Sequence, residues 1–351
     1  MMMKTPDMST PAQNFFGTTE LQLKKLFSEW KEQPYRVHQV FTWVYHYHCR
    51  DFNEMTNLSK SLRSRLADNF YFALPKIQSR THSKDGSIKY LFELDDGAVI
   101  ESVWMPSDSR NTLCLSTQVG CRLNCTFCLT ASLGLKRNLT AGEIIGQHIA
   151  INEKLEEKDK ITNVVFMGMG EPFLNYKNTI AAADLLHQPK GINMAAWRIT
   201  ISTAGIVPKI RQFAEEEQPY KLAVSLNGST HEQRLKTMPI TQTHTFSNLI
   251  NASKDYAYNS RNRITFEYVL MDGINDEPQD AERLIRLLGS IECKLNMIPY
   301  NEIGGVYNRP SDERIEAFME PLKRAPFPVT VRWSKGTDID AGCGQLVTSS
   351  T

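Results

Sequence analysis

The sequence lacks any long hydrophobic run. No stretch of about 18 or more consecutive apolar residues occurs in the 351-residue chain, so it offers no candidate for a membrane-spanning helix. The polar stretch 1–14 contains Pro6 and Pro11 and lacks the apolar core of a secretory signal. We therefore expect a cytoplasmic protein without a membrane partner, beginning with a disordered tail over residues 1–14.

The sequence also lacks a strong charge imbalance. Lys and Arg number 40 against 39 Asp and Glu, which gives a net charge of +1 and excludes a global field that would attract nucleic acid. Residues 20–80 are locally basic, with ten Lys and Arg, including Lys24, Arg36 and Lys60, against six Asp and Glu. A solvated helical surface explains such an excess as often as RNA binding does, so both explanations stay open.

The cysteine pattern does not favour disulfide bonds. The chain has seven cysteines, an odd number, and Cys121, Cys125 and Cys128 fall within eight residues. In the absence of a secretory signal, this pattern favours reduced thiols that bind a metal over a disulfide framework.

From about residue 112, apolar strand-like runs alternate with amphipathic segments. This alternation predicts a parallel sheet, and six repeats are too few for a closed eight-fold barrel, so we expect an α/β fold with an open, partial (β/α)6 barrel. Its active site would lie at the carboxyl ends of the strands. Strands are predicted at 113–119, 163–167, 198–202, 222–226, 264–271, 294–298 and near 328–333, and helices at 141–156, 176–187, 207–216, 246–259, 277–291 and 312–325.

The first hundred residues have a different pattern. Short helices are predicted at 21–30, 37–47 and 60–70, followed by strands at 88–94 and 98–105 around the turn Asp95-Asp96-Gly97. We therefore predict a small N-terminal helical domain at 15–75, a candidate for RNA binding. A β-hairpin bridge at 76–108 and a barrel at 109–347 would follow.

The strongest motif is Cys121-Arg-Leu-Asn-Cys125-Thr-Phe-Cys128, which follows the first predicted barrel strand. Three thiolates in one loop can bind three of the four irons of a [4Fe–4S] cluster. A structural zinc site needs a fourth ligand, usually from a second cysteine pair or a histidine pair, and none follows here. The fourth iron could then bind S-adenosylmethionine (SAM), and an electron from the cluster could cleave it to a 5′-deoxyadenosyl radical. A zinc loop or three unrelated buried thiols are the alternatives.

Small and polar residues follow the other predicted strands. Gly168-Met169-Gly170-Glu171 comes after the second, where glycines let the backbone approach a ligand closely. Short polar side chains after later strands suit the carboxylate or ribose of SAM, although each could equally be a cap or turn residue. The residues predicted to bind SAM are Gly170, Glu171, Ser202, Ser225, Leu226, Asn227 and Asn301.

Two further thiols lie in suggestive places. Cys343 lies in the loop 336–346, Gly-Thr-Asp-Ile-Asp-Ala-Gly-Cys-Gly-Gln-Leu, where small residues leave it accessible. Cys114 lies in the first predicted barrel strand. A buried strand thiol and a C-terminal thiol without a role are the plainer interpretations.

Five motifs together resemble the RlmN/Cfr family of radical SAM RNA methyltransferases. They are the cluster loop, Gly-Met-Gly-Glu-Pro, Ile-Ser-Thr-Ala-Gly at 201–205, Asn-Met-Ile-Pro-Tyr-Asn at 296–301 and the loop around Cys343. The stretch 35–60 resembles the accessory helical domain of that family. The resemblance covers about 20–347 and is stronger to the RlmN branch. Asn227 and Gly342 stand where the family usually has His and Ala.

The resemblance implies a ping-pong reaction that uses two SAM molecules per turnover. The first would methylate Cys343, and the radical from the second would take a hydrogen atom from this S-methyl group. The methylene carbon would then add to C2 of an adenine. Cys114 would release the product by forming a disulfide with Cys343, and Glu101 would accept the C2 proton.

The implied substrates are 23S rRNA, at the peptidyl-transferase centre, and tRNA, at the adenosine 3′ of the anticodon. A flavodoxin or ferredoxin would donate the electron, and a monomer is expected. Two alternatives remain open: methylation at C8 of the same rRNA adenosine, as in the Cfr branch, and a non-catalytic iron–sulfur or zinc RNA-binding module.

Overall fold

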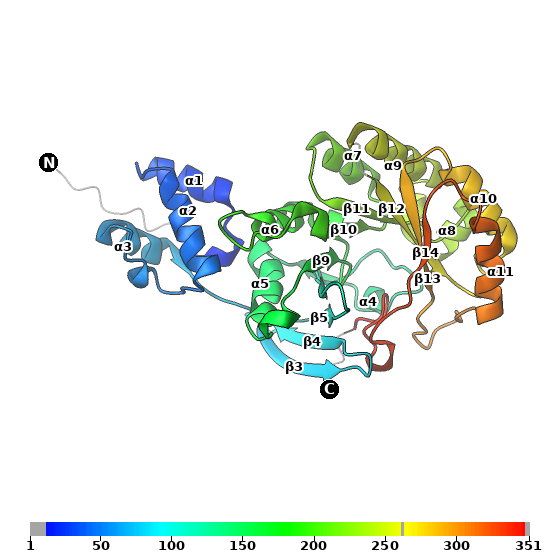
Figure 1. The fold of residues 1–351 in the computed structure, drawn as a ribbon, viewed down its shortest axis with the longest axis horizontal. Helices are drawn as coiled ribbons and strands as arrows, with labels where there is room; N and C mark the ends of the chain where they lie inside the picture. The colour runs from blue at the N-terminus through cyan, green and yellow to red at the C-terminus, as the bar shows by residue number, and fades with distance from the viewer. Residues whose placement is uncertain (1–11, 261–262, 348–351) are drawn as a thin grey trace.

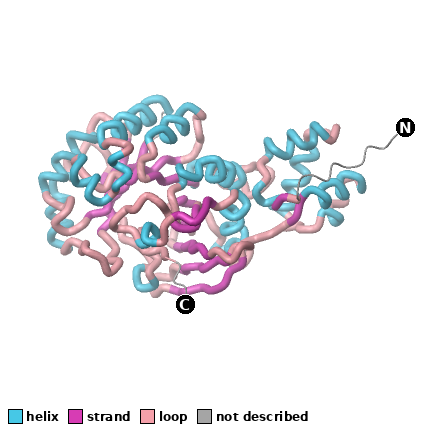
Figure 2. The backbone as a smooth tube through the Cα atoms, turned by 180° about the vertical axis from the view of Figure 1, so that it is seen from behind, coloured by secondary structure: helices cyan, strands magenta, loops and turns pink. Residues whose placement is uncertain are grey.

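A computed structural model describes residues 12–260 and 263–347. Figure 1 shows a small group of N-terminal helices set to one side of a larger α/β body, which contains the rest of the described chain. A single ten-stranded sheet runs through the larger body. The tube of Figure 2 shows the same arrangement from behind, with the strands gathered in the body and helices around them.

The sheet has the order β14-β13-β12-β11-β10-β9-β6-β5-β4-β3. Because β14 and β3 are its two edges, the sheet does not close, which confirms the predicted open barrel. Its parallel part consists of β6 (Thr112–Cys114), β9 (Asn163–Phe166), β10 (Ile199–Thr203), β11 (Lys221–Ser225), β12 (Ile264–Leu270), β13 (Cys293–Pro299) and β14 (Val329–Val331).

Amphipathic helices connect the parallel strands, as parallel pairing requires. The sequence pattern at Thr140 produces the predicted capping box, because Thr140 Oγ1 accepts from Glu143 N–H at 3.2 Å and the Glu143 carboxylate accepts from Thr140 N–H at 2.8 Å. Figure 1 shows these helices around the outside of the sheet. They are α5 (Ala141–Asn152), α6 (Tyr176–His187), α7 (Val207–Glu215), α9 (Phe246–Ser260), α10 (Pro278–Leu288) and α11 (Asp312–Leu322).

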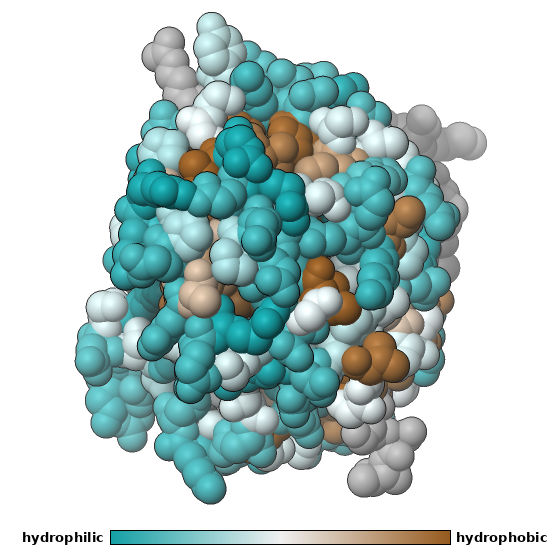
Figure 3. Space-filling model, turned by 90° about the vertical axis from the view of Figure 1, so that its right-hand side faces the viewer, coloured by the Kyte–Doolittle hydropathy of each residue, from teal (hydrophilic) through white to brown (hydrophobic). Residues whose placement is uncertain are grey.

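The outermost helices bury one side only. In α10, Ala281, Leu284 and Leu288 are buried at helical spacing, while most of the other side chains face outward. Figure 3 shows the end of the molecule that carries α10 and α11, and its surface is mainly hydrophilic with scattered apolar residues. These helices therefore cover the sheet and present a polar face to solvent.

The N-terminal unit has an aromatic core of its own. The Phe15 ring lies 5.4 Å from that of Phe70, 5.8 Å from Phe52 and 6.0 Å from Phe41, measured between centroids. This core joins α1 (Glu20–Glu29), α2 (Tyr35–Phe41) and α3 (Lys60–Asn69). β1 (Gln13–Asn14) pairs with β2 (Phe70–Tyr71), so the expected tail over 1–14 does not extend that far, and residues 1–11 lie outside the described residues.

Three sequence-based element predictions need correction. The strand predicted at 113–119 is broken, because β6 ends at Cys114 and β7 (Gln118–Gly120) pairs with β8 (Leu135–Asn138) in a separate sheet. The helix predicted at 141–156 ends at Asn152, whose carbonyl accepts from Lys160 Nζ at 2.7 Å and whose side chain accepts from Ile161 N–H at 2.9 Å.

The third correction concerns the bridge at 76–108. It contains an additional strand, β3 (Lys76–His82), which is polar and mostly exposed and so carried no apolar signal. β3, β4 (Ile88–Glu93) and β5 (Val99–Met105) form an antiparallel extension that continues the barrel sheet through the pairing of β5 with β6. The hairpin is therefore a part of the same sheet as the barrel.

Candidate active site

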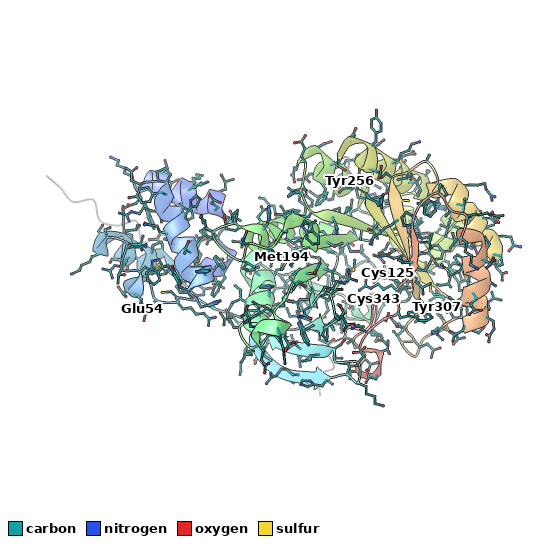
Figure 4. The ribbon with its side chains drawn as sticks, viewed as in Figure 1. Glu54, Cys125, Met194, Tyr256, Tyr307 and Cys343 are labelled. Carbon is teal, nitrogen blue, oxygen red and sulfur yellow. The ribbon has the colours of Figure 1, made fainter. Side chains whose placement is uncertain are left out.

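A cavity of about 880 Å³ lies at the carboxyl ends of the parallel strands. This is the end at which parallel α/β folds bind their ligands. Its wall combines residues that follow β9 to β12, the loop 121–128 and the C-terminal loop around Cys343. Figure 4 shows Cys125 and Cys343 close together inside the body.

The structure brings the three cysteines of the motif together, since Cys121, Cys125 and Cys128 all line this cavity. Their loop, 121–128, is held by the backbone: Cys121 N–H donates to Gly134 O at 3.0 Å and Thr126 N–H to Thr237 O at 3.0 Å. The loop begins immediately after Gly120, where φ is +76° and a side chain would collide with the Gly134 carbonyl.

The environment of these thiols fits an iron–sulfur cluster. Burial raises the pKa of Cys125 well above its ordinary value and that of Cys121 to about 11, and the neighbouring thiols add to both shifts. Thiolates in such a place require a compensating cation, which the irons of a cluster would supply. Within residues 12–260 and 263–347, no three His, Cys, Asp or Glu side chains are arranged for a single metal ion.

Gly170 and Glu171, predicted to bind SAM, both line the cavity. Gly170 has φ of +96°, and a Cβ there would lie 2.4 Å from the Cβ of Gln118, so only glycine fits. Glu171 is buried, and its carboxylate accepts from Ala204 N–H at 2.7 Å and from Phe173 N–H at 2.9 Å. Burial raises the pKa of Glu171 to about 7, although these hydrogen bonds oppose the shift. Glu171 thus ties the loops after β9 and β10 together at the cavity wall.

The other predicted SAM contacts divide into two groups. Ser202, Ser225 and Asn227 line the cavity. Asn227 adopts φ of +50°, a left-handed conformation that asparagine tolerates, and its Oδ1 accepts from Val269 N–H at 2.8 Å. Leu226 is fully buried outside the cavity wall, and its backbone N–H pairs with Glu267 O in the sheet. Neighbouring positions on a strand alternate between faces, so Leu226 points away from the cavity.

Asn301 also lies outside the wall of this cavity. Its Nδ2 donates to Ser334 Oγ at 2.9 Å and to the Cys343 carbonyl at 3.0 Å. It therefore holds the residues 334–347, which we call the C-terminal strap. In the structure Asn301 positions the strap that carries the thiol.

Cys343 lies where two cavities meet. It lines the cluster-side cavity and also an adjoining cavity of about 390 Å³, to which Cys114, Met167 and Arg332 contribute. Burial raises the pKa of the Cys114 thiol to about 12, which Arg332 partly offsets. Cys114 and Cys343, the two further thiols noted in the sequence, therefore line the same cavity although 229 positions separate them.

The C-terminal strap is fastened to the turn between β3 and β4, a contact that the sequence did not reveal. Asp338 accepts from Ser83 Oγ at 2.5 Å and from Lys84 N–H at 3.1 Å. Asp85 accepts in turn from Gly336 N–H at 2.7 Å. Two carboxylates, one from each side, therefore join the strap to the added strands of the sheet.

Glu101 lies on β5 beneath the end of the strap. Its Oε2 accepts from Val347 N–H at 3.0 Å and its Oε1 lies 3.3 Å from Lys89 Nζ. It is only 4% exposed, and burial raises its pKa while Lys89 opposes that shift. Glu101 is not a lining residue of either thiol-containing cavity.

The sequence analysis missed one carboxylate at the site. Glu267, on β12, is 5% exposed and lines the cluster-side cavity. A signal was available, because an acidic residue in the middle of the apolar strand Ile264–Leu270 must have a polar or ligand-binding reason to be buried.

Comparison with known proteins decides the family. A model described as the ribosomal RNA large subunit methyltransferase N-terminal domain matches residues 13–72, and the radical SAM superfamily model matches residues 115–287. The dual-specificity RNA methyltransferase RlmN of Paracoccus denitrificans is 43% identical over 353 residues, covering 96% of this chain and 90% of that protein. The chain belongs to the RlmN family of radical SAM RNA methyltransferases.

Other RlmN-family relatives agree. A probable dual-specificity RNA methyltransferase RlmN of Bacillus velezensis is 42% identical and covers 93% of this chain and 90% of its own length. The crystal structure of a radical SAM methyltransferase from Sphaerobacter thermophilus superposes with a TM-score of 0.87, at 41% identity over 96% of this chain and 99% of that one. The protein is therefore an enzyme, and its radical SAM family implies SAM and a [4Fe–4S] cluster as cofactors.

The described part of the chain has no helix that combines the length and the hydropathy of a membrane span.

Proposed function

We propose that this RlmN-family enzyme methylates C2 of adenosine in 23S rRNA, at the peptidyl-transferase centre, and in tRNA, at the adenosine 3′ of the anticodon. The observation that carries the proposal is the position of Cys343 at the junction of the cluster-side cavity with the cavity that contains Cys114. A thiol that passes a methyl-derived carbon from a cofactor to a base needs access to both sides. The relatives are named dual-specificity RNA methyltransferases, which supports RNA as the substrate.

In this proposal Cys121, Cys125 and Cys128 hold the cluster. SAM occupies the cavity beside Gly170, Glu171, Ser202, Ser225 and Asn227. When bound, these two cofactors supply the methyl group and the 5′-deoxyadenosyl radical. The burial of the site limits the access of other molecules from which a carbon radical could take a hydrogen atom.

Cys343 performs the transfer. Its sulfur would lose its proton, carry the methyl group that SAM supplies, and present that group for removal of one hydrogen atom. The carbon then bonds to C2 of the adenine, which is too electron-poor to attack a sulfonium methyl directly. Cys114, as a thiolate, would then attack the Cys343 sulfur, so that a disulfide forms as the bond from that sulfur to the methylene carbon breaks. The carbon would take up a proton to become the methyl group, and the one surplus electron would pass to a one-electron acceptor such as the oxidised cluster.

Glu101 is the proposed acceptor of the C2 proton. Its raised pKa suits a group that must take up a proton. Because its carboxylate now binds Val347 N–H, action as a base requires the end of the C-terminal strap to move away. Asn301, by holding the Cys343 carbonyl, positions the thiol for the first step.

The proposed accessory domain, 15–75, would contact the RNA. Tyr35 and Tyr47 are exposed, and the Arg36 guanidinium lies 5.0 Å from the centre of the Tyr35 ring. Exposed aromatic rings beside cations suit unpaired bases and phosphates. The target adenine would leave its stack to reach the interior of the barrel.

The test combines three measurements on anaerobically reconstituted protein. Four irons per chain, release of 5′-deoxyadenosine from SAM under reductant, and 2-methyladenosine in RNA treated with the protein are the expected results. A product of 8-methyladenosine alone would assign the C8 reaction instead. Four irons without SAM cleavage would favour a non-catalytic RNA-binding protein. A flavodoxin or ferredoxin donor, a cytoplasmic location and a monomeric state stay predictions from the sequence.

A further inference from the structure

Glu267 lies between two cavities. On β12 it pairs in register with Ser225 of β11 and Asn296 of β13, in the middle of the barrel. It lines the cluster-side cavity and also a second cavity, of about 1050 Å³, that lies at the opposite ends of the strands. We call the second one the basic cavity. Glu267 and Met167 are common to both walls, so the two cavities approach each other at these side chains.

The basic cavity has the composition of a nucleic-acid site. Its acidic lining residue is Glu267, against six cations, and Trp197 and Trp333 at its edge are 58% and 57% exposed. Cations suit phosphates, and exposed indoles suit unpaired bases. SAM carries no phosphate, so this composition favours RNA as the occupant. The six cations are Arg110, Arg198, Lys221, Lys294, Arg332 and Lys335.

The hydrogen bonds of Glu267 leave one oxygen for a ligand. Thr330 Oγ1 donates to Asn296 Oδ1 at 2.7 Å, which turns the Asn296 Nδ2 group toward Glu267 Oε1 at 3.0 Å. Glu267 Oε2 is buried and has no hydrogen-bond partner among the described residues, while Arg332 and Lys294 act on the carboxylate as nearby charges. A buried acceptor of this kind is costly unless a donor arrives with the ligand.

We propose that Glu267 Oε2 accepts a hydrogen bond from the exocyclic amino group of the target base, so that Glu267 selects adenine over a 6-oxopurine. The inference rests on the proposed function. The donor could in principle be the amino group of the SAM adenine, which has the same chemistry. The basic cavity favours the RNA base, because Glu267 is the acidic group that faces it.

The variant Glu267→Gln should place a hydrogen-bond donor where Glu267 Oε2 is an acceptor. Asn296 Nδ2 would still donate to the carbonyl oxygen of the new amide, because Thr330 keeps the Asn296 amide in its orientation. The new –NH₂ group would then face the cavity. It repels a 6-amino group and matches a 6-oxo group, so the preference for adenine should disappear.

The experiment compares the holoenzyme and Glu267→Gln on three RNA oligonucleotides with adenosine, inosine or purine riboside at the target position, all of which carry a hydrogen at C2. We measure kcat/KM for methylation by mass spectrometry and affinity by fluorescence anisotropy. The unmodified protein should favour adenosine by about 10-fold to 100-fold, the loss expected for one unsatisfied buried acceptor. Glu267→Gln should favour inosine or show no preference.

Glu316→Gln is the matched control, since Glu316 is an exposed residue of α11 and its removal changes the net charge equally. Iron content and RNA-free S-methylation of Cys343 report whether Glu267→Gln is correctly folded. An adenosine preference that is the same in both proteins overturns the inference. The inference is also overturned if Glu267→Gln needs a higher SAM concentration for Cys343 methylation while its base preference stays unchanged. That result would mean that Glu267 binds SAM.

Failure of the proposed function has a different signature. If the unmodified protein methylates none of the three RNAs, the proposed function is contradicted, whereas the affinities still test Glu267. In that case the inference is still supported if the unmodified protein binds the adenosine RNA more tightly than the other two RNAs and Glu267→Gln loses this difference. Equal affinities for the three RNAs in the unmodified protein would overturn it.

Discussion

The loop 121–128 and the C-terminal strap both bring sulfur to the same cavity, but they are held in different ways. Backbone hydrogen bonds to the barrel and a glycine that admits no side chain hold the loop. Exposed side-chain contacts, such as Asp338 with Ser83, fasten the strap at its far end to the turn between β3 and β4. The strap thus combines an exposed attachment at Asp338 with buried bonds beside Cys343, where Leu129 N–H donates to Gly344 O at 2.7 Å and Thr130 Oγ1 to Leu346 O at 2.6 Å.

This difference matches the tasks proposed for the two segments. A cluster has to remain in one position, and cooperative backbone contacts in a packed barrel open only with much of the fold. Cys343 has to meet SAM, the base and Cys114 in turn. The exposed hydrogen bonds at the far end of the strap contribute little net free energy, so that end can open at low cost, whereas buried bonds to Gly344 and Leu346 hold the part around Cys343.

The largest effect should separate the two segments directly. Cys125→Ala should abolish SAM cleavage and RNA methylation together, because it removes a cluster ligand. Cys343→Ala should abolish methyl transfer while SAM cleavage continues. Iron content, 5′-deoxyadenosine and methylated nucleosides are measured in parallel. Normal SAM cleavage by Cys125→Ala, or RNA methylation by Cys343→Ala, would contradict the roles proposed for these thiols.

A second prediction concerns the thiol that the sheet holds opposite the strap. Cys114→Ala should trap a covalent adduct between the protein and RNA, since nothing then displaces the base from Cys343. Denaturing electrophoresis and mass spectrometry after nuclease digestion would detect the adduct. Cys293→Ala is the control, because it removes another buried thiol from a barrel strand. RNA-free Cys114→Ala protein from cells that contain RNA would count against a resolving thiol.

Acid should affect the barrel before it affects the attachment of the strap. His148 of α5 is fully buried, both ring nitrogens lack a partner among the described residues, and burial lowers its pKa to about 4. Unfolding returns the pKa to about 6.5, so the unfolded chain binds the extra proton and stability falls as pH drops from about 6.5 to 4, by about 3 kcal/mol. His148→Leu should flatten this dependence of the urea midpoint on pH.

The strap contacts should persist through that pH range. Burial would raise the pKa of Asp85, but hydrogen bonds from Gly336 and Ser87 lower it to about 2, and the bond from Ser83 lowers the pKa of Asp338. Both carboxylates therefore stay ionised between pH 4 and 6.5. Hydrogen exchange of the strap that rises between pH 6.5 and 4 in the His148→Leu protein, whose barrel should keep its stability there, would contradict this separation.

The smallest effect should come from loosening the strap alone. Asp338→Asn weakens the acceptor of Ser83 and Lys84, and we expect RNA methylation to fall about 2- to 10-fold, the scale of one or two exposed hydrogen bonds. SAM cleavage and thermal stability should stay close to those of the unmodified protein. Asp255→Asn, at an exposed position of α9, is the control. A parallel loss of SAM cleavage would mean that the strap and the loop are not independent.

Local patterns predicted most of the barrel. The helix Tyr176–His187 has the predicted bounds, and five of the predicted strands lie within two residues of β9 to β13. The predictions failed at β3, where the sequence has no apolar pattern. They also failed after Cys114, where the run predicted as one strand is divided between two strands, β6 and β7, that pair in different sheets. In both cases the pairing depends on residues distant in the sequence.

The candidate site shows the same limit. The cluster spacing, Gly170 and Cys343 are recognisable because their chemistry is compressed into a few neighbouring residues. Glu101 was expected to accept the C2 proton, and in the structure its carboxylate binds the end of the strap, 246 positions later. Asn301 was expected to bind SAM, and in the structure it holds Ser334 and the Cys343 carbonyl.

The sequence by itself determined the order of strands and helices, the loop that carries three thiols and the small-residue loop around the fourth. Only the tertiary structure decided that Cys114 and Cys343 share a cavity, that carboxylates fasten the strap, and that Glu267 faces two cavities with one oxygen unpaired. The reason is physical: spacing along the chain governs local hydrogen bonding and periodicity, whereas contacts between distant segments follow from strand register and packing across the whole sheet.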